Sequence, residues 1–105
     1  MGRKLKFLVF TFPNEDGLKN PPSSVEFEAQ TDWFRRRLAD GTLDCAYHGD
    51  NHAVFIFNAE SPAQLEALMD AIPLADRMQR KIEPLIDLFA HTNRVSGYLK
   101  GLERR

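Results

Sequence analysis

The sequence predicts an α+β fold in which four strands and two helices follow one another in the order β-α-β-β-α-β. Three kinds of observation predict it. Short runs of β-branched and aromatic residues indicate strands. Two capping signals, each followed by helical spacing of apolar residues, indicate helices, and turn-rich segments separate the elements. No repeat, low-complexity tract or linker divides the chain, so we expect one domain over residues 1–105.

The first strand and the first helix lie in the N-terminal part of the chain. Residues Leu5–Phe12 are mostly apolar and aromatic, which is typical of a strand. A turn-rich segment follows at residues 14–24, long enough to suggest a lid or a flexible connection. Ser23 and Glu26 have the spacing of a capping box, which predicts a helix that runs to about Ala39.

The next two strands are separated by a short turn. Asp40 and Gly41 end the first helix, since glycine suits the left-handed position after a helix C-terminus. Apolar and polar side chains alternate over Thr42–His48 well enough for a strand, and the polarity of this segment places the strand at a sheet edge. The turn residues 49–51 lead into a strongly apolar strand over His52–Ala59.

The second helix has a clear N-terminal boundary. Ser61 is a capping residue, Pro62 fits the first helical position, and Gln64 has capping-box spacing from Ser61. Pro73 ends the helix. Its apolar side chains recur on one stripe, formed by Leu65, Leu68, Met69 and Ile72.

The C-terminal part of the chain contains one more strand and a candidate helix. Residues Lys81–Phe89 are predicted as the fourth strand, and Pro84 within it indicates an edge or a bulge. Residues Ala90–Arg105 have helical spacing of apolar side chains, although Gly97 and Gly101 weaken a helix there.

This order of elements is the ferredoxin-like arrangement, a four-stranded antiparallel sheet with two helices on one face. The strands at Leu5–Phe12 and His52–Ala59 carry apolar side chains toward both faces, unlike strands with one wet face. Two helices cover only one face, and an exposed apolar patch usually marks an interface. We therefore expect a homodimer or higher oligomer whose sheets face each other. The alternative is that the C-terminal segment folds back over the open face.

Composition and charge exclude several classes of function. The 14 basic and 15 acidic residues leave a net charge of −1 and are spread along the chain, which argues against nucleic-acid and membrane-surface binding. No apolar run approaches the ~20 residues that cross a bilayer. Cys45 is the single cysteine, so neither an intrachain disulfide nor a cysteine-only metal site is possible. We expect a cytoplasmic protein.

From residue 49 onward, a set of packing and turn residues has the spacing of a known family, without gaps. These residues are Gly49, Val54-Phe55-Ile56-Phe57, Glu60-Ser61, Leu65, Ile72-Pro73-Leu74, Met78 and Pro84-Leu85. With them the chain resembles muconolactone isomerase and its relatives, small proteins of the dimeric α+β barrel superfamily. The resemblance implies that fold and a reaction in which a proton moves within an unsaturated lactone carboxylate. Cys45 and Ala46 stand where family isomerases tend to carry a Trp-Arg pair, so a carboxylate clamp is missing.

The candidate catalytic residues surround the turn between the second and third strands. His48 and His52 bracket this turn, and an imidazole can act as general acid or base near neutral pH. Tyr47 is a candidate donor to a carbonyl oxygen. The alternatives are a solvated hairpin and a metal site with Asp50, for which no third strong ligand is evident.

Four further side chains are candidates for substrate binding: Trp33, Arg37, Phe10 and Phe55. We expect a small apolar, unsaturated or aromatic metabolite to be converted by proton transfer, with no tightly bound cofactor and no metal. Two other functions remain open from the resemblance. One is a non-catalytic carrier or accessory protein of a pigment or polyketide pathway, and the other is a cofactor-independent monooxygenase.

Overall fold

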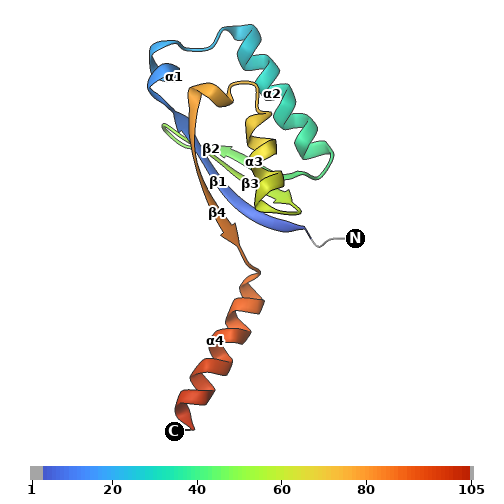
Figure 1. The fold of residues 1–105 in the computed structure, drawn as a ribbon, viewed down its shortest axis with the longest axis vertical. Coiled ribbons are helices and arrows are strands. Elements are labelled where there is room, and N and C mark those ends of the chain that lie inside the picture. Colours follow the sequence, from blue (N-terminus) through green and yellow to red (C-terminus); the bar gives the residue numbers. More distant parts are fainter. Residues whose placement is uncertain (1–3, 105) are drawn as a thin grey trace.

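The computed structural model describes residues 4–104 and contains one antiparallel sheet of four strands in the order β2-β3-β1-β4 (Figure 1). The strands are β1 (Leu5–Pro13), β2 (Leu43–His48), β3 (Ala53–Ala59) and β4 (Met78–Leu85). The helices are α1 (Glu15–Lys19), α2 (Ser24–Ala39), α3 (Pro62–Asp70) and α4 (Leu88–Glu103), with a 3₁₀ turn η1 (Ala75–Arg77) before β4. The predicted α+β class, the antiparallel sheet and a C-terminal helix are confirmed.

Local sequence signals determine where the two central helices begin and end. The Ser23 hydroxyl accepts from the Glu26 amide, and the Glu26 carboxylate accepts from the Ser23 amide, so the capping box of α2 is complete. Gly41 follows α2 with a positive φ of 81°, the conformation that glycine adopts most readily. At α3 the Ser61 hydroxyl caps Gln64, whose side chain accepts instead from the Glu60 amide.

The structure differs from the sequence prediction in two places. The segment 14–24 contains the short helix α1, because the Asn14 side chain accepts from the Gly17 amide and caps it. β4 lies several residues earlier than the predicted strand at residues 81–89. The Asp87 side chain accepts from the Ala90 amide and starts α4 at Leu88, so the end of the predicted strand is helical. Residue 105, the last residue of the predicted helix, lies outside the described part.

The hydrophobic core lies between the sheet and the helices α2 and α3, which both cover the same face (Figure 1). Alternate residues of β1 and β3 are buried on this face, as expected for a strand period of two. Trp33 and Phe34 of α2 pack against this core. Its fully buried members include Val9, Leu43, Phe57, Leu65 and Met69.

The other face of the sheet carries no helix. Leu8, Phe10, Val54 and Ile56 point to it and are only partly buried. On the β4 side this surface is bordered by Lys81 and Glu83, which are 3.6 Å apart. At one end it is closed by hydrogen bonds that join Lys6, Asp44 and Asn58. The open face is therefore an apolar centre with a polar border.

Helix α4 projects away from the sheet, and it does not fold back over the open face (Figure 1). The radius of gyration is 17.7 Å, compared with the roughly 13 Å expected for a compact chain of this length. No helix in the described part of the chain has both the length and the apolar character needed to cross a bilayer. The exposed apolar side chains of α4 include Leu88, Phe89, Val95, Tyr98, Leu99 and Leu102.

Candidate functional site

A cavity of about 380 Å³ lies between α2 and one end of the sheet. Its position follows from a patch of small side chains on the covered face. Thr11 of β1 pairs with Ala53 of β3, which pairs with His48 of β2, and Ala46 lies two residues before His48 on the same face. Small side chains at 11, 46 and 53 leave space beneath α2. The volume is within the roughly 300–1,000 Å³ range of small-molecule sites.

Aromatic rings form much of the cavity wall. Phe34 of α2 stacks on Phe55 of β3, with ring centroids 4.6 Å apart and an interplanar angle of 16°. Phe27 is 58% exposed and borders the opening. Tyr47 pairs with Val54, so its side chain, 71% exposed, points to the open face although the residue itself lies at the cavity. A wall with this composition favours a flat, apolar ligand.

The segment between β1 and α2 is docked at the cavity and forms part of its border. The Asn14 amide donates to the Arg77 carbonyl at 3.0 Å, and the Asn14 side chain donates to the Asp76 carbonyl at 2.8 Å. Gly17 lies against the same carbonyl of Arg77, where an added Cβ would be 2.2 Å from its oxygen. Both Gly17 and Pro22 line the cavity, which gives this segment a structural role beside the site.

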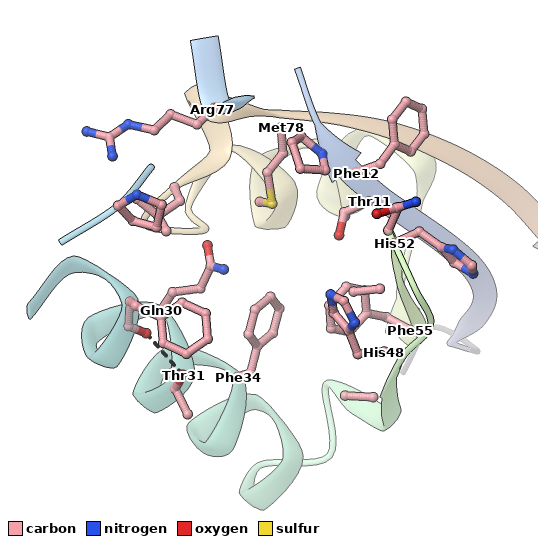
Figure 2. Close-up of a pocket in the computed structure, with 18 of the residues that line it drawn as sticks. Thr11, Phe12, Gln30, Thr31, Phe34, His48, His52, Phe55, Arg77 and Met78 are labelled. Atoms are coloured by element: carbon pink, nitrogen blue, oxygen red, sulfur yellow. Dashed lines mark hydrogen bonds between the residues drawn. The ribbon is translucent and has the colours of Figure 1, made fainter. Parts of the chain in front are cut away.

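The two candidate histidines lie at the cavity but face different directions (Figure 2). The His48 ring is turned into the cavity, toward Phe34. The His52 ring is turned toward the open face, where its centroid is 6.2 Å from that of Phe10. It also lies over Gly49, at which an added Cβ would be 2.7 Å from the ring. His48 is therefore the better placed of the two to reach a molecule bound in the cavity.

An ion pair lies beside the cavity. Arg77 lines the cavity, and its guanidinium is 2.9 Å from the carboxylate of Glu26 at the start of α2. Hydrogen bonds from the backbone and hydroxyl of Ser23, together with the positive charge of Arg77, hold the pKa of Glu26 below its usual value. The carboxylate stays ionised at neutral pH, and the two charges offset each other. This pair favours a neutral ligand.

Thr11 and Gln30 are among the polar cavity residues that were not sequence candidates, the others being Thr31, Asn51 and Arg77. Thr11 is only 5% exposed and lies on the sheet side. Gln30 lies on the helix side, and its Oε1 atom is buried without a hydrogen-bond partner among the described residues. The signal for Gln30 is its spacing from Phe27 and Phe34, three and four residues away, which places it on the inner face of α2.

The remaining candidates take other places. Trp33 is partly buried and packs against the core, 6.4 Å from Phe57 by ring centroids, and does not line the cavity. Arg37 lies 5.5 Å from the Trp33 ring and pairs with Asp40 at 3.3 Å. Phe10 points to the open face, in a shallow depression next to His52. Of the seven candidates, His48, His52, Tyr47 and Phe55 line the cavity, whereas Trp33, Arg37 and Phe10 lie elsewhere.

The described residues contain no group of three or more His, Cys, Asp or Glu side chains that could hold a metal ion. Cys45 is a free, partly buried thiol on β2. It pairs in register with Ile56, which places it on the open face and away from the cavity.

The fold and the cavity define an α+β protein with a four-stranded antiparallel sheet and a small-molecule-sized site under α2. Comparison with known protein families finds no matching family model, and none of the curated proteins is significantly similar to the chain. The resemblance to muconolactone isomerase is thus supported only at the level of this coarse fold.

Proposed function

We propose that this chain is a cytoplasmic, homodimeric protein of the ferredoxin-like, dimeric α+β barrel type. It binds a small, neutral, unsaturated or aromatic metabolite under α2 and assists its conversion by cofactor-free proton transfer. The observation that carries the proposal is the cavity itself, in which an aromatic wall surrounds a few polar side chains. Apolar pockets with a small number of convergent polar groups are the usual form of a small-molecule site.

The proton transfer is assigned to His48. Its neutral imidazole takes a proton from a carbon next to a carbonyl group and returns that proton to another carbon of the same conjugated system. A donor on the covered face of the sheet, such as the buried Thr11 hydroxyl, donates a hydrogen bond to the carbonyl oxygen, where negative charge develops. No electron acceptor or co-reactant is required, because the substrate and the product are isomers.

The open face supports the homodimer. Its apolar centre and polar border have the layout of a protein–protein interface. A two-fold contact between two such faces covers both with the same surface. The dimer leaves the cavity free, because α2 and the cavity lie on the opposite face of the sheet.

A binding protein without catalysis is the second candidate. The Glu26–Arg77 pair offsets the charges at the wall, and most of the remaining lining is apolar or aromatic. Such a site can retain a metabolite without reacting with it.

Hydrogen–deuterium exchange on 2-tetralone tests the two candidates together. This bicyclic ketone has acidic C–H bonds beside its carbonyl, and ¹H NMR in D₂O follows their loss. We expect the protein to accelerate the exchange and His48→Ala to remove most of the acceleration, since positioned acid–base groups contribute about 10²–10⁴-fold. His91→Ala is the matched control, because His91 lies on α4 outside the cavity.

Each outcome separates the candidates. Binding of 2-tetralone without accelerated exchange supports the carrier and contradicts the enzyme. Exchange that survives in His48→Ala but falls in His52→Ala assigns the proton transfer to His52 instead. Failure of 2-tetralone and of other neutral bicyclic aromatic probes to bind contradicts the cavity as a ligand site.

A further inference from the structure

Gln30 occupies an unusual position for a polar side chain on α2. It lies between Phe27 and Phe34 along the inner face of the helix and lines the cavity with them (Figure 2). Its amide extends from the helix toward the wall formed by Met78. The Oε1 atom is buried and receives no hydrogen bond from the described residues.

A buried carbonyl oxygen without a donor is costly, because it has lost its hydrogen bonds to bulk water. The neighbouring polar group on α2 does not supply the donor, since the Thr31 hydroxyl donates to the Phe27 carbonyl at 3.0 Å. Gln30 lines the cavity, so rotation of its side chain would turn the buried Oε1 toward a molecule bound there, which can then supply the missing donor.

The charges at the wall restrict the chemistry of that donor. A cationic ammonium group needs a negative partner, but the Glu26 carboxylate is paired with Arg77. The same pair leaves Arg77 engaged and disfavours an anionic ligand. A neutral hydroxyl meets the requirement, because it donates to Gln30 and can also accept from a donor such as the buried Thr11.

We infer that Gln30 is a specificity-determining residue that selects aromatic ligands carrying a hydroxyl group, with the phenol or naphthol O–H donating to Gln30 Oε1. The inference rests on the proposed function of the cavity as a ligand site. It extends that function by naming the substituent that distinguishes a bound ligand from an apolar molecule of the same shape.

The test uses two probes of nearly equal size, 2-naphthol and 2-methylnaphthalene, whose dissociation constants are measured by titration of the naphthyl fluorescence. We expect the wild-type protein to bind 2-naphthol about tenfold more tightly, as one neutral hydrogen bond allows. In Gln30→Met, which keeps the length of the side chain, the more apolar 2-methylnaphthalene becomes the better ligand. Gln79→Met is the matched control, since Gln79 is exposed on β4 and does not line the cavity.

The outcomes distinguish the inference from the proposed function. If both probes bind equally to the wild type, or if Gln30→Met retains the preference for 2-naphthol, the role of Gln30 is refuted while the cavity remains a ligand site. If neither probe binds to either protein, the cavity itself fails as a ligand site. Circular dichroism shows whether each variant is folded, and Gln30→Leu provides a second apolar variant if Gln30→Met is not.

Discussion

Replacing Leu8 and Ile56 together is expected to separate the proposed dimer into single chains. The two residues pair across β1 and β3, point to the open face and are only partly buried. The variant Leu8→Gln with Ile56→Thr introduces polar groups while keeping side chains of similar length or branching. The helix-covered core is untouched, so each chain should fold as before.

The expected magnitude follows from the surface that each side chain still exposes. Full burial of a Leu or Ile side chain stabilises by about 1.5–3 kcal/mol, and at most about a third of that is available to a partly buried one. A two-fold interface contains both residues twice, so the double variant removes up to about 2–4 kcal/mol from the dimer. The dissociation constant should therefore rise by up to about 30–700-fold.

Sedimentation equilibrium over a wide range of protein concentration measures this constant. Leu5→Gln is the control, because Leu5 is a 45% exposed apolar residue on the opposite face of β1, and its dissociation constant should match that of the wild type. A wild-type protein that remains a single chain at every concentration refutes the dimer. A double variant that dimerises as tightly as the wild type refutes the open face as its interface.

Three further outcomes are expected. Gly17→Ala places a Cβ 2.2 Å from the Arg77 carbonyl oxygen, so the variant should be less stable by about 1–3 kcal/mol and melt at a lower Tm. An unchanged Tm contradicts the docked position of α1. Hydrogen bonds from Lys6 and then Asn58 lower the pKa of Asp44. The ionised carboxylate therefore stabilises the fold above the unfolded-state pKa of about 3.9, and this stabilisation is lost as the pH falls through the lower folded-state pKa. Asp44→Asn should therefore make urea unfolding less dependent on pH below about 4, and an unchanged dependence contradicts this assignment. Gly97→Ala adds a Cβ that meets no atom within 4 Å. The variant should stabilise α4 by about 0.5–1 kcal/mol and strengthen the helical circular dichroism signal at 222 nm. A weaker signal shows that Gly97 is needed in α4.

Much of the fold could be predicted because the relevant signals are local. The Ser23–Glu26 capping box and Gly41 lie within a few residues of the ends that they define, and the structure contains both. The β4–α4 boundary was predicted too late in the chain. Apolar residues such as Leu88 and Phe89 fit a strand as well as a helix, and the cap at Asp87 decides between them.

The candidate site was only partly predictable, because it depends on contacts between distant segments. His48 and His52 are near neighbours in sequence, so their joint presence at the cavity could be expected from the hairpin. The turn of the His52 ring toward Phe10 depends on packing across β1 and β3. Gln30 could be placed on the inner face of α2 from helical spacing, but its unpartnered oxygen becomes evident only when the opposite wall is in place.

The projection of α4 divides the described chain into two parts that can open separately. Because this helix makes almost no contact with the sheet, its backbone amides are protected from solvent exchange by α4 alone. In a single chain, hydrogen exchange should therefore be fast along α4 and slow in β1 and β3. Trp33, the single tryptophan, packs against the core, so its fluorescence reports the unfolding of the sheet and is insensitive to the melting of α4.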